Sequence, residues 1–440
     1  MDIETIAIRF GYGLPVTVQD KTEVLALLSG PDHAVERWPG PRLADLAPLI
    51  RDYRALRKTN DEAAQKDLLQ QGDQLALRGV QAIFCRALGS TDGFRERLVA
   101  FWADHFTVAP RNRLERALPA ILIDEAIRPH VTGRFADMLR AVTLHPAMLI
   151  YLNQEASFGP GSPRGKRQKK GLNENLAREL LELHTLGVGA AYSQTDVREL
   201  AELLTGLTIG PEGFVFDPRR AEPGAETVLG ATYQGKGLEP VHQVLDDLAR
   251  HSDTARHIAR KLAVHFVSDT PEAGLVAALE SVFRDTGGDL RAVAEALVAH
   301  PAAERPVAQK ARQPFDFMIA ALRALGVGPD AVRSLEFRQA RRLLFDPLAA
   351  MGQPFQQASG PDGWPEGEAD WITPQGLAAR IDWAMAAPER LVRPLPDPRA
   401  FLSAALGSRA GDRLVWAVGA AESARDGVGL VLASPEFNRR

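Results

Sequence analysis

The sequence predicts an all-α protein whose helices pack in two lobes, with one minor β-hairpin between them. Two observations favour this fold class. Apolar residues recur at three- and four-residue intervals along most of the 440-residue chain, which is the spacing of one helix face. Strand-like sequence is confined to two short runs, "FVFD" (214–217) and "ETVLG" (226–230). We therefore expect helices on both sides of these runs and few strands.

In chain order, the first clear helical patterns cover 41–58 and 92–106. In the second pattern, Phe94, Leu98, Phe101, Trp102 and His105 share one apolar side. Further helical patterns fall near 115–131, 174–186, 194–205, 239–250, 253–267, 273–285, 289–299, 308–325, 336–350, 374–386 and 411–421.

The two strand-like runs stand between a helical first half and a helical second half. We expect them to pair as one hairpin across the loop "PRRAEPGA" (218–225). This predicts an N-terminal helical lobe over 1–210, a hairpin over 211–236 and a C-terminal helical lobe over 237–440. The division also fits the length, because a chain of this size exceeds one ordinary core.

Composition excludes several classes of function. Apolar residues make up 45% and charged residues 25% of the chain, and the net charge is −4. These values are typical of a soluble globular protein and give no overall case for nucleic acid or an anionic membrane. A single cysteine, Cys85, excludes a disulfide or an all-cysteine zinc site within one chain. No signal peptide or membrane-spanning run is visible, so we expect a cytoplasmic location.

The helix predicted at 174–186 carries an unusual set of polar residues. At 100° per residue, Glu174, Arg178 and Glu182 share one stripe, whereas His184 lies on the apolar side. Alternating charges at this spacing are ordinary helix support. The other interpretation buries the face against a neighbour, where the charges must form a network.

A catalytic site is one hypothesis for this helix. If the helix at 92–106 packs on it, two histidines meet beside carboxylates. Glu179 or Glu182 is then the general base, and His184 or His105 the acid. Neither H-E-x-x-H nor a paired E-x-x-H occurs, so we assign no metal ligands and no cofactor.

Cations are concentrated directly ahead of that helix, in the loop 157–171. They either form a solvated run or hold an anion, together with the N-terminus that Asn173 caps. The candidate binding residues of this region are Arg164, Lys166, Arg167, Lys169, Lys170, Asn173, Glu174, Asn175, Arg178 and Asp196.

A second candidate binding loop, 354–373, carries Trp364 and Trp371 among four acidic residues. An exposed tryptophan can anchor a partner. Tryptophans in a proline-rich loop more often pin the loop to the protein body, and the sequence leaves both interpretations open.

Several blocks resemble one bacterial family. The longest is "GLNENLARELLELHTLGVGAAYSQTDVRELAELLTGLT" (171–208). "RERLVAFWADHFTV" (95–108), "HPAMLIYLNQEASFGPGS" (145–162), "ARHIARKLAVHFVSD" (255–269), "KARQPFDFMIAALRALG" (310–326) and "GPDGWPE" (360–366) follow the same order as in the family. The chain is identified as a member of the family called domain of unknown function 1800.

The resemblance implies little about chemistry, because the family has no settled activity. Its members often carry export signals and are often encoded beside a second family, whose fold resembles sulfatases and alkaline phosphatases. This chain departs from many relatives, which read His-Asp-Pro-Gly where it reads Ala221-Glu222-Pro223-Gly224. The family's motif polar residues correspond to His105, Asn173, Glu174, Asn175, Arg178, Glu179, Glu182, His184 and Asp196.

We therefore carry two hypotheses of function forward. In the first, the protein is a binding or accessory protein that pairs with a sulfatase- or phosphatase-like partner through the basic and tryptophan-bearing loops. Export together with a signal-bearing partner belongs to this hypothesis. In the second, the protein is a hydrolase that uses the His/Glu site on the central helix.

Overall fold

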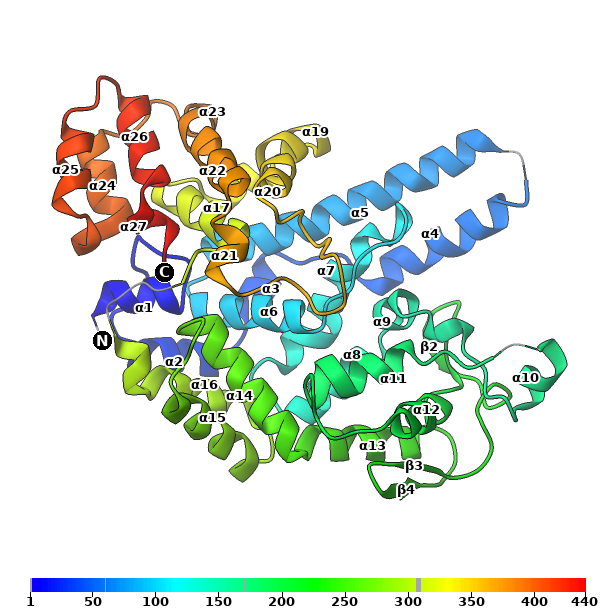
Figure 1. Ribbon diagram of the computed structural model, residues 1–440. Coiled ribbons are helices and arrows are strands. Elements are labelled where there is room, and N and C mark those ends of the chain that lie inside the picture. The colour runs from blue at the N-terminus through cyan, green and yellow to red at the C-terminus, as the bar shows by residue number, and fades with distance from the viewer. Residues whose placement is uncertain (1, 60, 170, 306–309) are drawn as a thin grey trace.

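The structure is a computed structural model, and it describes residues 2–59, 61–169, 171–305 and 310–440. It confirms the all-α class (Figure 1). The first part of the chain forms α1 (Ile3–Arg9), α2 (Lys21–Ser29), α3 (His33–Arg37), α4 (Leu43–Leu56), α5 (Glu62–Gly89), α6 (Gly93–His105), α7 (Leu118–Leu122), α8 (Phe135–Leu144), α9 (Pro146–Tyr151), α10 (Pro163–Gln168), α11 (Asn175–Glu179) and α12 (Gln194–Leu203).

The second part is helical as well. It contains α13 (Glu239–Arg250), α14 (Ser252–Phe266), α15 (Ala273–Asp285), α16 (Leu290–Ala299), α17 (Pro314–Ala324), α18 (Pro329–Arg333), α19 (Phe337–Ala340), α20 (Asp346–Ala350), α21 (Glu368–Trp371), α22 (Pro374–Ala386), α23 (Pro388–Leu391), α24 (Pro398–Leu406), α25 (Asp412–Gly419), α26 (Ala424–Ala433) and α27 (Pro435–Asn438). Short π-helical segments at Ile123–Ile127, Leu180–Thr185 and Arg341–Phe345 continue α7, α11 and α19, respectively.

The predicted strand pairing is wrong. The described residues form two hairpins, β1 (Leu207–Gly210) with β2 (Gly213–Phe216), and β3 (Glu226–Val228) with β4 (Ala231–Tyr233). In each hairpin a two-residue turn separates the strands, because Gly210 pairs with Gly213 and Val228 pairs with Ala231. Closing so short a loop costs less chain entropy than closing the long loop 218–225, so each run pairs with its nearest neighbour.

Two hydrophobic clusters fill the interior. One draws mainly on α6 to α16, and the other on α17 to α27. Helix α5 contributes to both, with Leu75 in the first cluster and Phe84 in the second. A shared helix ties the two cores together. The division of the chain into lobes around 211–236 stays a prediction.

The longest helix of the described residues, α5, was not among the predicted ones. Its first half, from Glu62 to Gln71, is mostly polar and gives no clear apolar stripe. Figure 1 shows why: α4 and α5 extend away from the body as a helical arm, so this half has water on most sides. Only the second half, which includes the buried Phe84 and Cys85, reaches the cores.

Candidate functional site

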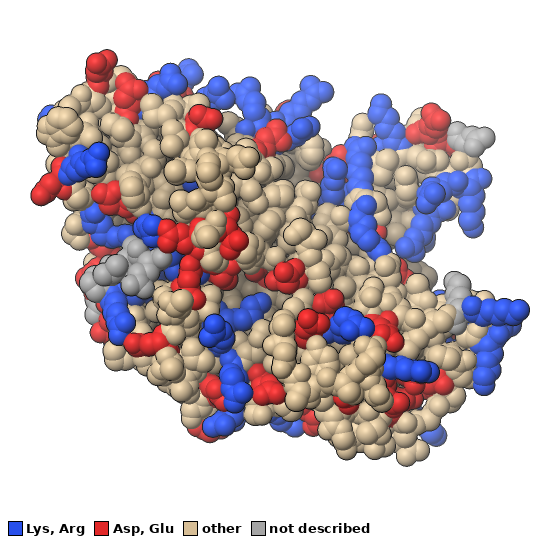
Figure 2. All heavy atoms as spheres, in the orientation of Figure 1, with Lys and Arg blue, Asp and Glu red and all other residues tan. Residues whose placement is uncertain are grey.

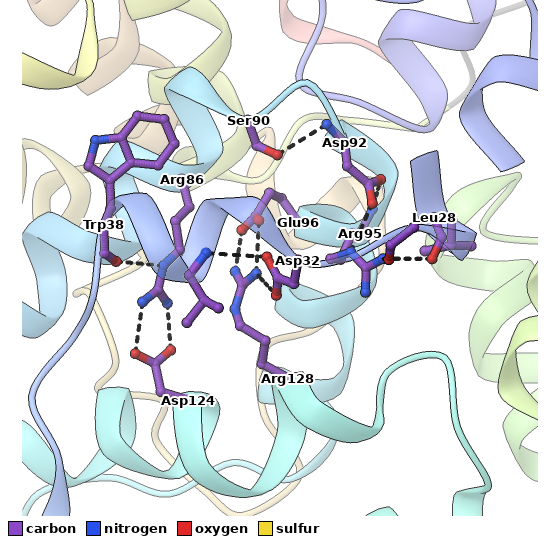
Figure 3. A network of polar contacts seen from close by, with 12 residues as sticks. Leu28, Asp32, Trp38, Arg86, Ser90, Asp92, Arg95, Glu96, Asp124 and Arg128 are labelled. Atoms are coloured by element: carbon purple, nitrogen blue, oxygen red, sulfur yellow. Dashed lines mark hydrogen bonds and ion pairs between the residues drawn. The ribbon is translucent and has the colours of Figure 1, made fainter. Parts of the chain in front are cut away.

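Buried ion pairs hold α6, the helix on which the site is built (Figure 3). Arg128 contacts both Glu96 of α6, at 3.0 Å from Nη1 to Oε1, and Asp32, at 2.8 Å from Nη1 to Oδ2. One helix turn earlier, Asp92 caps α6 and pairs with Arg95 at 2.8 Å. Charges buried in this way are tolerated only when they are paired and hydrogen-bonded. The network therefore fixes the position of α6.

At its C-terminal end, α6 presents Asp104 to the loop that follows α20. The carboxylate oxygen Oδ1 accepts a hydrogen bond from the backbone N–H of Trp364 at 2.8 Å. Gly363 permits this approach, since it has a φ of +80° and an added Cβ would lie 2.7 Å from that same oxygen. Burial, together with the nearby Glu366 and Asp362 carboxylates, raises the pKa of Asp104 to about 7. Asp104 thus titrates near neutral pH.

A chain of polar contacts runs beside Asp104. His265 lies between Arg97, at 3.1 Å from Nη2 to Nε2, and Glu366, at 2.5 Å from Oε1 to Nδ1. A guanidinium group can only donate. Nε2 of His265 must therefore accept from Arg97, and the proton lies on Nδ1, which donates to Glu366. Lys310 completes the chain, with Nζ at 3.0 Å from Glu366 and 2.7 Å from Asp269.

Arg97, Asp104 and His265 line a pocket, which we call the inner pocket, with a volume of about 140 Å³. Most of its wall is apolar, and a few polar side chains converge on it, an arrangement typical of small-molecule sites. Arg97 in this wall is 1% exposed, and among the described residues its Nε has no hydrogen-bond partner. The polar wall residues are Arg97, Asp104, Thr107, His265, Gln313, Asp316, Gln353 and Gln356.

The two histidines predicted as catalytic do meet. His105 Nε2 lies 3.2 Å from the backbone oxygen of His184, and the ring centroids are 6.2 Å apart. A third imidazole, His257, lies 6.0 Å from His105. Burial and the charge of Lys261 together lower the pKa of His184 to about 3 and that of His257 to about 4. All three imidazoles are neutral at pH 7.

Glu179 and Glu182, the two candidates for the general base, precede His184 on the central helix. Both are half-buried. Burial and the neighbouring Glu182 raise the pKa of Glu179, and Glu182 also lies beside the hydroxyl of Tyr192, whose pKa it raises. The helix changes to π geometry at Leu180, so the 100° spacing that placed these side chains no longer holds beyond it. A catalytic role for His105, Glu179, Glu182 and His184 stays a prediction.

The polar residues around the start of the central helix fasten segments to one another. The N-cap of α11 is Glu174 and not Asn173 as predicted, although Asn173 Oδ1 accepts from the N–H of Asn175 at 3.0 Å. Glu174 pairs with Arg178 at 3.2 Å, and Asp196 Oδ1 accepts from the N–H of Leu229 at 2.7 Å. Their role in binding stays a prediction.

The basic loop contains helix α10. Arg164 pairs with Asp217 at 2.8 Å, whereas Lys166, Arg167 and Lys169 are exposed. Within the described ranges these three cations form no ion pair. Lys170 lies outside the described residues. Figure 2 shows blue side chains at the edge of the molecule where Figure 1 places α10, across from the basic arm formed by α4 and α5.

The tryptophan-bearing loop is packed on the body. Trp371 is 3% exposed, and its Nε1–H donates to the backbone oxygen of Pro365 at 2.9 Å. Trp364 lies in the wall of the inner pocket and 6.0 Å from Trp371, ring centroid to ring centroid. Pinning the loop is therefore what Trp371 does in this structure, as one of the two interpretations expected. Binding of a partner by Trp364 and Trp371 stays a prediction.

Sequence reasoning missed most of the inner pocket. Asp104, His265 and Glu366 all lie within blocks that carry the family resemblance, "FWADHF", "LAVHF" and "GWPE". That shared membership was the available signal. A second missed group is a set of carboxylates, since one oxygen each of Glu199, Glu202 and Glu226 lie within 4.8 Å of one another.

The fold and site define a helical protein with a largely apolar pocket and a carboxyl group that titrates near neutrality. Comparison with known protein families shows which family the chain belongs to. A family described as "Protein of unknown function (DUF1800)" matches residues 7–439, so the chain belongs to that family. No curated protein and no solved structure matches the chain. Among the described residues, no helix is both long and apolar enough to cross a bilayer.

Proposed function

We propose that the protein is a hydrolase that works by general acid–base catalysis in the inner pocket. One observation carries this proposal: Asp104 is held by the N–H of Trp364 at the pocket wall, and its pKa is raised to about 7. A general base is most effective when its pKa lies near the working pH. Strongly shifted groups in a concave site are candidates for function.

The residues of the pocket have separate roles in this proposal. Ionised Asp104 takes a proton from water, and the water oxygen bonds to the carbon of an ester. The bond from that carbon to the leaving oxygen then breaks, and Asp104 returns the proton to the leaving oxygen. Arg97, held by His265 and Asp316, stabilises the oxygen that becomes negative. His265 is a positioning residue because its Nε2 already accepts from Arg97.

The hydrolase is tested by a turnover screen on carboxylic, phosphate and sulfate esters. Wild type and Asp104→Asn are compared, with Asp370→Asn as the control, because Asp370 is an exposed acid of the tryptophan-bearing loop. We expect turnover in wild type and in the control, and a loss of about 10²–10⁴-fold in Asp104→Asn. Equal turnover in all three proteins contradicts the assignment.

A second function, that of an accessory protein, is favoured by the exposed cations of α10. Lys166, Arg167 and Lys169 project into solvent and suit an acidic partner surface. The partner we propose is the sulfatase- or phosphatase-like protein implied by the family resemblance, with export of the two together.

Co-expression and pull-down test the accessory role. We expect Lys166→Glu with Arg167→Glu to abolish the complex, whereas Arg291→Glu, in an exposed pair on α16, leaves it intact. No complex of the wild-type pair at micromolar concentration contradicts the accessory role.

A further inference from the structure

The inner pocket has an outer neighbour with which it shares a wall. This second cavity, which we call the outer groove, has a volume of about 440 Å³. Phe355 and Gln356 line both cavities. Phe355 lies 5.4 Å from Phe315 of the inner pocket and stacks 6.5 Å from Phe345 of the outer groove, between ring centroids. A ligand longer than the inner pocket therefore meets aromatic surface on both sides of this wall.

Gln356 has an unusual backbone conformation and an unpaired side-chain amide at this wall. Its φ of +55° is in the left-handed region that residues other than glycine rarely adopt. Its amide nitrogen is buried, and among the described residues no acceptor lies within hydrogen-bond distance of it. Leaving a buried donor without a partner destabilises the folded state. Strain and an unpaired donor together are typical of a position that a ligand completes.

The size of the inner pocket restricts the group that enters it. An engineered apolar cavity of about 150 Å³ binds benzene, and the inner pocket has about 140 Å³. Its apolar wall includes Phe106, Leu122 and Phe315. The pocket is therefore the size of one aromatic ring or a compact branched acyl group.

The charges of the inner pocket exclude a strongly anionic ligand. Its cation, Arg97, already pairs with Asp316 and donates to His265. Asp104 adds a negative charge once it is ionised. No net positive charge is left to hold a phosphate or sulfate dianion. A neutral carbonyl, in contrast, accepts from a single amide donor such as Gln356.

From these observations we infer that the two cavities form one site for neutral esters or amides of a compact aryl or branched carboxylic acid. The acyl group occupies the inner pocket, the amide of Gln356 donates to the carbonyl oxygen, and the leaving group lies in the outer groove. This inference rests on the proposed hydrolase, for which it names the substrate class.

Binding of amide probes tests the inference without turnover. We use isothermal titration calorimetry on Asp104→Asn with benzamide, acetamide, benzanilide and phenyl phosphate. We expect benzamide to bind at least about tenfold more tightly than acetamide, because a buried ring contributes more than 1.4 kcal/mol. Benzanilide binds more tightly still, and phenyl phosphate more weakly than benzamide.

Matched variants separate the two cavities. Ala103→Phe, with Ala103→Val as a milder second variant, fills the inner pocket and weakens benzamide and benzanilide alike. Ala349→Phe fills the outer groove. It removes only the additional affinity that benzanilide has relative to benzamide. Gln356→Leu weakens every carbonyl probe, whereas Gln375→Leu, at an exposed glutamine of α22 that lines neither cavity, does not. Circular dichroism confirms that each variant is folded.

The outcomes distinguish the inference from the proposed function. Equal affinity for acetamide and benzamide, or no binding of any amide at millimolar concentration, overturns the substrate class. Loss of benzamide binding in Ala349→Phe overturns the division of roles between the cavities. If the probes bind as expected but no ester is turned over, the binding site stands and the hydrolase fails. If phosphate or sulfate esters are turned over through Asp104, the hydrolase stands and the substrate class fails.

Discussion

Asp104 Oδ1 accepts a hydrogen bond from the backbone N–H of Trp364 at 2.8 Å, which joins positions 260 residues apart in sequence. The contact ties the end of α6 to the loop before α21 and holds the carboxylate at the wall of the inner pocket. Burial and two neighbouring carboxylates raise the pKa of Asp104. The single hydrogen bond lowers it, and so does Lys261, but neither offsets the burial. The same packing that builds the pocket thus sets the protonation of its carboxyl group.

The pH dependence of turnover follows from the raised pKa of Asp104. A general base must be ionised, so the rate rises as the pH passes the pKa of about 7 and levels off above it. We expect kcat/KM for the best ester of the screen to show this rise in wild type and to lose it in Asp104→Asn. A rise centred near pH 4, the ordinary value for an aspartate, contradicts the assigned base.

Gly363 gives a test of the loop contact that does not change Asp104 itself. Its φ is +80°, and an added Cβ would lie 2.6 Å from the backbone oxygen of Asp104 and 2.7 Å from its Oδ1. Gly363→Ala therefore combines backbone strain of about 1–2 kcal/mol with a clash that displaces the carboxylate.

Gly326→Ala is the matched control for that substitution. Gly326 has a φ of +73°, and nothing lies within 4 Å of its added Cβ. We expect backbone strain to lower the free energy of unfolding by a similar amount in both variants. The clash adds a further loss of stability in Gly363→Ala, and only this variant loses turnover. Urea denaturation and the ester assay measure the two effects. Unchanged turnover in Gly363→Ala argues against a catalytic Asp104.

The fold class was predictable because helical periodicity depends on residues that are only three or four positions apart in the sequence. Helices α13, α15 and α22 begin and end where their apolar spacing does. The strand pairing was not predicted, because the sequence pattern indicates no strand at 207–210, where β1 forms, and so gives no signal for its two-residue turn at 211–212. The inner pocket was beyond local patterns, since Asp104, His265 and Gln356 come from three distant segments. Only tertiary packing brings such groups together.

The central helix shows a further limit of periodicity. Its α-helical spacing correctly buried Leu176 and Leu180. At Leu180 the backbone changes to a π-helical segment, and the N–H of Leu186 bonds to the carbonyl of Leu181. A helical wheel drawn at 100° per residue is then no longer a reliable guide to the later side chains, although His184 is buried as its position on the apolar side predicted. The predicted stripe shared by Glu174, Arg178 and Glu182 depended on that wheel.

The buried ion pair between Arg86 and Asp124 gives a prediction about stability. Arg86 is fully buried, and its Nη2 lies 2.9 Å from Asp124 Oδ2. Removing one partner leaves an uncompensated buried charge, so we expect Asp124→Ala to lower the free energy of unfolding by about 3–5 kcal/mol. Glu295→Ala, in an exposed pair with Arg291, is the control and costs less than about 1 kcal/mol. Chemical denaturation that finds equal losses contradicts the burial of the pair.

Glu366 predicts how the protein responds to acid. Burial alone would raise its pKa, but His265 and Lys310 outweigh burial and lower the pKa to about 2. A carboxyl group with a lowered pKa stabilises the folded state above its unfolded pKa, and this stability is lost as the pH falls towards the folded value. The unfolded pKa of a glutamate is about 4.3. The contribution of Glu366 therefore disappears between about pH 5 and pH 2.

Glu366→Gln removes that pH dependence and leaves a side chain of the same size. We expect a lower melting temperature than wild type at pH 6, and a difference that shrinks as the pH is lowered to 3. Glu368→Gln is the control, because Glu368 is a half-buried acid of the same loop. A difference between Glu366→Gln and wild type that stays constant from pH 6 to pH 3 is incompatible with an ionised Glu366 held between His265 and Lys310, because the two proteins differ only in whether residue 366 loses a charge in this window.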